Sequence, residues 1–229
     1  MPGHDHVVPP PAQAAVPVAG GGSFPVRRVY CVGRNYAEHA REMGHDPDRE
    51  LPFFFMKPAD ALVTGGADMP YPPMTADLHH EMELVVALKS GGSDIAEADA
   101  LSHVWGYAAG LDMTRRDLQG EAKKAGRPWD MGKGFDHSAP IGDLTPAAGV
   151  DPGHGRIELK VNGAVRQASD LGSLIWSVPE TIAYLSKLVR LEAGDLIFTG
   201  TPEGVAAVSR GDMLEGVIEG VGTVRTRIT

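Results

Sequence analysis

The amino-acid sequence predicts a β-rich α+β fold, because stretches with strand character outnumber those with helical character. Glycine and proline are frequent, with 29 and 18 of the 229 residues, which favours many turns and short strands over a helix bundle. Hydrophobic residues make up 42% and charged residues 22% of the chain, a composition typical of one globular domain with its own core.

The first 24 residues differ in composition from the rest, and we expect them to form a flexible N-terminal arm. Prolines at 9–11 and glycines at 20–22 interrupt this stretch, and no apolar periodicity runs through it. The predicted division is therefore an arm over residues 1–24 and a single folded domain over residues 25–229.

Strands are predicted where apolar residues are concentrated or alternate with polar ones. Residues 157–161 alternate in this way, and Asn162-Gly163 predicts a type I′ turn into a returning strand at 164–167. The other predicted strands are 29–32, 52–56, 79–88, 104–111, 196–198 and one or two between 213 and 228.

Three helices are predicted from signals at their ends. The first runs from Asn35 to Gly44, and the second begins with Thr114 as its N-cap and stops at Gly126. The third begins at Ser177, which a proline and a glutamate follow within one turn.

Two glutamates in the predicted strand at 79–88 have the arrangement of a metal site. Side chains alternate along a strand, so Glu81 and Glu83 should project from the same face. Two carboxylates on a mostly apolar strand repel each other and lose hydration unless a cation lies between them. The alternative is that the pair marks the solvated face of a half-exposed sheet. The neighbouring His79 and His80 are expected to be structural.

Asp112 favours the metal interpretation, because it ends a second apolar run where a predicted strand gives way to a helix. Carboxylate oxygens select hard divalent ions. We therefore expect Mg²⁺ or Mn²⁺, with Ca²⁺ as a substitute, at Glu81, Glu83 and Asp112.

The net charge of −9 argues against a nucleic-acid partner and requires a locally positive pocket for any anionic ligand. Arg116 and Gln119 share a face of the predicted helix after Asp112, and Lys133 follows a glycine-bounded loop. No apolar run approaches the ~20 residues needed to cross a bilayer, and no signal peptide is evident. A cytoplasmic protein without membrane contact is expected.

Six segments occur in an order that is more specific than any one of them. They are Val32-Gly33-Arg34-Asn35-Tyr36 with His39 and Glu42, Lys57-Pro58, His80-Glu81-Met82-Glu83-Leu84, Asp112 to Gln119, Lys133-Gly134-Phe135-Asp136 and Phe198-Thr199-Gly200-Thr201-Pro202. The ordered set resembles the fumarylacetoacetate hydrolase family over roughly residues 25–229. The resemblance implies a mixed β-sandwich roll, one catalytic domain, a Mg²⁺ or Mn²⁺ ion and a homodimer.

The resemblance also implies an activity, the hydrolysis of a carbon–carbon bond in a 2,4-diketo acid. The expected substrate is fumarylpyruvate, cleaved to fumarate and pyruvate as in gentisate degradation. The matching positions are the metal ligands Glu81, Glu83 and Asp112, the catalytic residues His39, Glu42 and Lys133, and the substrate-binding residues Arg34, Arg116, Gln119 and Thr201. We expect the His39–Glu42 pair to activate water and Lys133 to stabilise a developing anion. Arg34, Arg41 and Arg127 are unranked candidates for a far carboxylate.

Other functions remain open at this point. Oxaloacetate decarboxylation, general acylpyruvate hydrolysis and isomerisation of a hydroxymuconate share the metal-stabilised enolate, but only hydrolysis needs an activated water. A β-rich binding module without catalysis is the remaining alternative. It predicts that Glu83→Ala and chelators leave the function intact.

Overall fold

The structure, a computed structural model, describes residues 6–36 and 50–229. One sheet consists of β3 (Arg28–Gly33), β4 (Phe53–Lys57), β7 (Met82–Leu88), β8 (Val104–Leu111), β11 (Thr145–Pro146) and β14 (Asp195–Phe198). A second sheet consists of β12 (Arg156–Val161), β13 (Ala164–Asp170), β15 (Met213–Ile218) and β16 (Gly222–Arg227). Three short pairs are β1 (Ala15–Pro17) with β2 (Ser23–Pro25), β5 (Leu62–Val63) with β10 (Ala139–Pro140), and β6 (Leu78–His79) with β9 (Thr114–Arg115). The helices are α2 (Glu97–Ala100), α3 (Arg116–Lys124), α4 (Asp130–Lys133) and α5 (Val178–Leu188).

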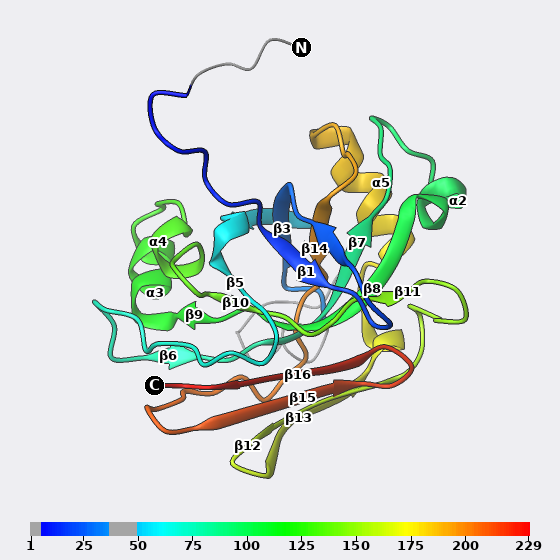
Figure 1. The fold of residues 1–229 in the computed structure, drawn as a ribbon. Helices are drawn as coiled ribbons and strands as arrows, with labels where there is room; N and C mark the ends of the chain where they lie inside the picture. Colours follow the sequence, from blue (N-terminus) through cyan, green and yellow to red (C-terminus); the bar gives the residue numbers. More distant parts are fainter. Residues whose placement is uncertain (1–5, 37–49) are drawn as a thin grey trace.

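The two larger sheets form a sandwich, with the four-stranded sheet at the bottom of the view in Figure 1. The six-stranded sheet has the order β11-β8-β7-β14-β3-β4 and is mixed, because β14 runs parallel to β3 and antiparallel to β7. The four-stranded sheet, β13-β12-β15-β16, is antiparallel throughout. Helices α3 and α4 lie together at one end of the sandwich, beside β9 (Figure 1).

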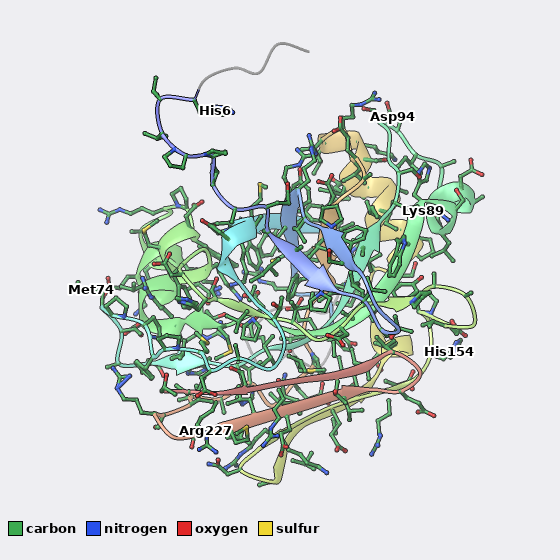
Figure 2. The ribbon with its side chains drawn as sticks, in the orientation of Figure 1. His6, Met74, Lys89, Asp94, His154 and Arg227 are labelled. Atoms are coloured by element: carbon green, nitrogen blue, oxygen red, sulfur yellow. The ribbon has the colours of Figure 1, made fainter. Side chains whose placement is uncertain are left out.

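The core occupies both faces of the six-stranded sheet. Leu84 faces the four-stranded sheet and joins Leu159 in the larger apolar cluster, whereas Val85 belongs to a second cluster on the opposite face. All seven residues of β7 are buried for this reason. Figure 2 shows side chains filling the space between the sheets, while the labelled Met74 and His154 lie at the periphery.

The N-terminal segment contributes to the second cluster, contrary to the expected arm over residues 1–24. Strands β1 and β2 pair antiparallel, and their central residues Val16 and Phe24 are 0% and 7% exposed. One apolar side chain at the centre of each short strand is enough to seat this hairpin on the sheet. The packed part of the chain therefore begins near Ala14, and the boundary expected at residue 25 lies too late.

Several local predictions are confirmed, and one is wrong. Asn162 and Gly163 have φ of 52° and 80°, as a type I′ turn requires, and Ser177 caps α5 in a capping box with Glu180. Thr114 does not cap a helix, because it pairs with His79 in β9, and α3 begins only at Arg116. Among the described residues, no helix has the length and apolar character needed to cross a membrane.

Candidate active site

Three buried carboxylates meet at one end of the β7–β8 pair. These strands are antiparallel neighbours with Met82 opposite Leu111, and the N–H of Asp112 donates to the carbonyl oxygen of Glu81 at 2.8 Å. One carboxylate oxygen from each of Glu81, Glu83 and Asp112 lies within 4.8 Å of the others. The three residues are 5%, 1% and 0% exposed, so the interpretation as a solvated sheet face is wrong.

The route by which the glutamates converge differs from the predicted one. Strand β6 ends at His79 and pairs with β9, whereas β7 begins at Met82 and pairs with β8. The chain therefore crosses between two sheets at His80 and Glu81, and the alternation expected over 79–88 is interrupted. The backbone hydrogen bond holds Glu81 beside Asp112 instead, and Glu83 lies in β7 opposite Gly110, two residues before Asp112 in the chain.

Three cationic side chains surround the carboxylates. Lys133, the last residue of α4, places Nζ 2.7 Å from Glu81 Oε2 and 2.7 Å from Asp112 Oδ2. Lys57, the last residue of β4, places Nζ 2.8 Å from Asp112 Oδ1. Arg116, the first residue of α3, pairs with Glu81 Oε1 and donates to Gln119 Oε1 at 2.6 Å.

The described cations equal the carboxylates in number, but their ion pairs fall on Asp112 and Glu81 and leave out Glu83. Burial alone would lower the pKa of Lys133, but Asp112 and Glu81 raise it, so Lys133 remains a cation. Burial and the charges of Asp112 and Glu81 raise the pKa of Glu83 well above its usual range. In the described part of the chain, Glu83 has no ion pair and accepts a hydrogen bond from the N–H of Gly200 at 2.8 Å.

This donor set fits a hard divalent ion. A cation held by Glu81, Glu83 and Asp112 would offset the repulsion that the buried Glu83 experiences from the other two carboxylates. Three carboxylate ligands would leave positions for water or substrate, since Mg²⁺ prefers six oxygens. The residues present therefore fit the expected Mg²⁺ or Mn²⁺.

A small cavity of ≈ 50 Å³ adjoins the carboxylates and contains the predicted pocket residues. Its wall is formed by Val32, Gly33, Arg34, Phe55, Glu81, Glu83, Arg116, Gln119, Lys123, Trp129, Lys133 and Thr201. All four predicted substrate-binding residues line this cavity, and so does Lys133. The predicted His39 and Glu42, like Arg41, lie outside the described residues.

Lys57 belongs to one of the six sequence segments, but its place beside the carboxylates was not predicted. Lys57 is 1% exposed, and its Nζ donates to the carbonyl oxygen of Met113 at 3.1 Å and to that of Lys133. A lysine at the end of an apolar aromatic strand could have indicated a site residue, because a buried ammonium group needs a carboxylate partner. Lys57 therefore positions Asp112 and the end of α4 together.

Replacing Lys57 by methionine is expected to lower the free energy of unfolding by about 3–5 kcal/mol, because Asp112 and two carbonyl oxygens lose a buried partner. Urea unfolding of the variant and the wild type measures the difference. Lys89→Met is the matched control, since the exposed Lys89 follows the buried strand β7 directly. Equal stability of the two variants would contradict the assigned role of Lys57.

Gln167 was also missed, and it fixes the orientation of Thr201. Its Oε1 accepts from the N–H of Met82 at 3.0 Å, and its Nε2 donates to the carbonyl oxygen of Pro202 at 2.8 Å. A backbone N–H only donates and a backbone carbonyl only accepts, so these two bonds define which end of the amide is which. The second Nε2 proton goes to Thr201 Oγ1 at 2.8 Å. Thr201 thus accepts from Gln167 and keeps its own hydroxyl proton to donate within the cavity it lines.

His80 completes this network behind the carboxylates. Burial lowers the pKa of His80 to about 4, which keeps the ring neutral at pH 7. Because Gln167 Oε1 is an acceptor, His80 Nδ1 carries the proton and donates to it at 3.0 Å. The interpretation of His80 as a structural residue agrees with this placement.

Gln167→Leu is expected to lower the free energy of unfolding by about 1–3 kcal/mol, because it leaves buried donors and acceptors without partners. It should also raise KM for a 2-oxo acid substrate, since the Thr201 hydroxyl loses its orientation. Gln13→Leu serves as the control, because Gln13 is exposed and is absent from the wall of the cavity beside the carboxylates. An unchanged KM in a folded Gln167→Leu variant would show that Thr201 does not depend on this amide.

Comparison with known proteins decides the family. The model of the fumarylacetoacetate hydrolase C-terminal domain matches residues 28–229. The chain belongs to the fumarylacetoacetate hydrolase family. The predicted resemblance and the predicted fold, a β-rich α+β sandwich roll, are both confirmed.

Relatives with named activities differ in their chemistry. A fumarylpyruvate hydrolase of Ralstonia sp is 47% identical over 184 residues, which cover 80% of this chain and 96% of the relative. A mitochondrial oxaloacetate tautomerase of Rattus norvegicus is 44% identical over 203 residues, which cover 88% of this chain and 91% of the relative. The chain is therefore related both to hydrolases and to a tautomerase.

Among solved structures, the chain is similar to a fumarylpyruvate hydrolase from Pseudomonas aeruginosa in complex with Mn²⁺ and pyruvate. The sequence identity is 55%, the TM-score is 0.95, and the match covers 98% of this chain and 99% of the other. That neighbour holds a divalent ion of the class expected here.

Proposed function

We propose that this protein is a divalent-metal-dependent acylpyruvate hydrolase, and that its preferred reaction converts fumarylpyruvate and water to fumarate and pyruvate. The observation that carries the proposal is the buried triad of Glu81, Glu83 and Asp112 beside a cavity with Lys133 in its wall. The similarity to fumarylpyruvate hydrolases, one of them bound to Mn²⁺ and pyruvate, supports the substrate.

The reaction breaks the bond between the acyl carbonyl carbon and the methylene carbon of the pyruvyl group. A divalent ion held by the triad would polarise the 2-oxo acid and neutralise the departing enolate. Arg116 and Lys133 place positive charge along the cavity, and the Thr201 hydroxyl is a donor for the 2-oxo acid carboxylate. These groups bind and orient the pyruvyl end.

The attacking water needs a base, and we assign that role to His39. His39 and Glu42 are three residues apart in a segment predicted to be helical, so their side chains would share a face. The Glu42 carboxylate would orient the imidazole, and an imidazole nitrogen of His39 would take a proton from water as its oxygen attacks the acyl carbonyl. The bond between the acyl carbon and the methylene carbon then breaks, and its electrons leave with the pyruvyl fragment as an enolate. The proton held by His39 passes to that enolate, which gives pyruvate and returns the imidazole to its neutral form.

A reaction of oxaloacetate is the second candidate, because a relative that is 44% identical is an oxaloacetate tautomerase. Tautomerisation and decarboxylation of oxaloacetate also pass through an enolate that a divalent ion would stabilise, but neither reaction needs an activated water. The smaller ligand would occupy only the pyruvyl end of the site.

A metal-supplemented assay of the purified protein against four acids tests the proposal. Fumarylpyruvate, maleylpyruvate, acetylpyruvate and oxaloacetate are compared by kcat/KM in the presence of Mg²⁺ or Mn²⁺. The expected order places fumarylpyruvate first, with fumarate and pyruvate formed in equal amounts. Equal or greater turnover of oxaloacetate would overturn the choice of substrate.

Three further parts of the proposal follow from the sequence and stay predictions. They are participation in the degradation of gentisate, assembly as a homodimer and a cytoplasmic location. Size-exclusion chromatography with light scattering measures the second of these directly.

A further inference from the structure

A second, larger cavity adjoins the one beside the carboxylates. Its volume is ≈ 600 Å³, and its wall is formed by Arg34, Phe53, Phe54, Phe55, Met56, Arg127, Pro128, Trp129, Asp130 and Lys133. Arg34, Phe55, Trp129 and Lys133 line both cavities. A ligand anchored at the carboxylates can therefore extend past these shared residues into the larger space.

The wall of the larger cavity is aromatic and well supported. The rings of Phe53 and Trp129 meet edge to face with centroids 5.2 Å apart, and Phe55 packs on Trp129 at 5.9 Å. Phe55 lines both cavities, and Lys133 Nζ lies 4.9 Å from the centre of its ring. Aromatic rings that are fixed by neighbouring side chains provide a surface on which a flat, unsaturated part of a ligand can stack.

Two arginines in this wall bring positive charge to a space that the proposed chemistry does not use. Arg34 lines both cavities, and Arg127 lines the larger one. Lys133 is paired with Glu81 and Asp112, so in the described part of the wall Arg34 and Arg127 stand against a single carboxylate, that of Asp130. The region is thus cationic within a chain whose net charge is −9.

Arg34 is held in an unusual position. Its φ is +57°, a left-handed conformation that is strained for a residue with a side chain. Its guanidinium lies 5.4 Å from the centre of the Phe53 ring, and its side chain is 25% exposed. Its ion pair with Glu50 spans 3.8 Å, and the Glu50 side chain is 70% exposed, so this pair neutralises little of the arginine charge. Strain of this kind is kept where a side chain must be aimed at a ligand.

We propose that Arg34 and Arg127 bind a second carboxylate at the far end of an acylpyruvate, while its planar unsaturated chain lies against Phe55 and Trp129. This inference rests on the proposed function, because it places the 2-oxo acid end at the three carboxylates. It narrows the substrate class to acylpyruvates that end in a carboxylate. A trans double bond keeps the far carboxylate extended and directs it into the larger cavity, whereas acetylpyruvate and oxaloacetate are too short to reach it.

Paired substrates and paired variants test the inference. We expect Arg34→Met and Arg127→Met each to lower kcat/KM for fumarylpyruvate by about 10–100-fold, the equivalent of one charged hydrogen-bonding partner. For acetylpyruvate, which lacks the far carboxylate, we expect Arg127→Met to stay within about twofold of the wild type, because Arg127 lines only the larger cavity. Arg34 lines both cavities, so Arg34→Met should lower kcat/KM for acetylpyruvate less than it lowers kcat/KM for fumarylpyruvate. Arg190→Met is the control, because Arg190 lines neither cavity and its side chain is 72% exposed. Far-ultraviolet circular dichroism verifies that each variant is folded.

The outcomes separate the two proposals. Equal losses on both substrates, or no loss on either, would overturn the far-carboxylate site while leaving acylpyruvate hydrolysis intact. If the wild type hydrolyses no acylpyruvate, the proposed function fails, and calorimetric binding of fumarate still tests the site. Fumarate should then bind the wild type more tightly than crotonate, which has a methyl group in place of one carboxylate, and Arg34→Met should abolish the difference. Equal binding of the two acids would reject the site.

Discussion

Replacing Glu83 by glutamine is expected to lower kcat/KM for fumarylpyruvate by on the order of 10³-fold and, in the same protein, to raise the stability of the metal-free form. The activity falls because one of three anionic ligands becomes neutral. The stability rises because the folded state disfavours the charged form of Glu83, which is buried beside Asp112 and Glu81, and its raised pKa reflects this cost. An amide oxygen can still accept the hydrogen bond from Gly200.

The sign of the stability change is what distinguishes a metal site from a structural ion-pair network. A raised pKa means that the folded state disfavours the charged form, so removing the charge at neutral pH should add about 1 kcal/mol to the free energy of unfolding. Glu81→Gln is the matched control, and it should destabilise the protein because Glu81 pairs with Lys133 and Arg116. Urea unfolding in the presence of a chelator measures both variants. A loss of stability in Glu83→Gln equal to that in Glu81→Gln would contradict this account.

Replacing His39 by alanine is expected to lower the hydrolysis of fumarylpyruvate by about 10²–10⁴-fold, the usual contribution of a general base. The affinity for Mn²⁺ should not change, because no proposed ligand is altered. Decarboxylation of oxaloacetate, which needs neither an activated water nor a base, should keep its rate.

His154→Ala is the control for this experiment, since His154 is exposed at the periphery of the molecule (Figure 2). Both variants are compared for fumarylpyruvate hydrolysis and for Mn²⁺ binding by calorimetry. Hydrolysis at the wild-type rate in His39→Ala would remove the base from the proposed mechanism. Equal loss of hydrolysis and of Mn²⁺ affinity would instead give His39 a role in holding the ion.

Local signals in the sequence were sufficient for the hairpin at Asn162-Gly163, for the start of α5 and for the three carboxylates. Each depends on residues close in the chain, or on acids whose burial in apolar strands is costly without a cation. The crossing between sheets at His80 could not be foreseen, because it depends on which strands pair with β6 and β7.

The roles of Lys57 and Gln167 in the site could not be predicted from the sequence, because their partners are distant in the chain. The carbonyl partner of Lys57 at Met113 is 56 residues away, and Gln167 bonds to Met82 across 85 residues. Neither contact leaves a periodic trace in the sequence. The hairpin of β1 and β2 was not predicted for another reason. Prolines and glycines surround Val16 and Phe24, the two buried apolar residues at the centres of its strands.

Turnover of fumarylpyruvate by wild-type protein before and after removal of divalent ions tests the central claim most directly. We predict that activity disappears when chelator and buffer exchange strip the protein, and that Mn²⁺ or Mg²⁺ restores it with one fumarate and one pyruvate formed per substrate. Undiminished turnover by the thoroughly stripped protein would contradict the assignment of Glu81, Glu83 and Asp112 as the ligands of a catalytic metal ion.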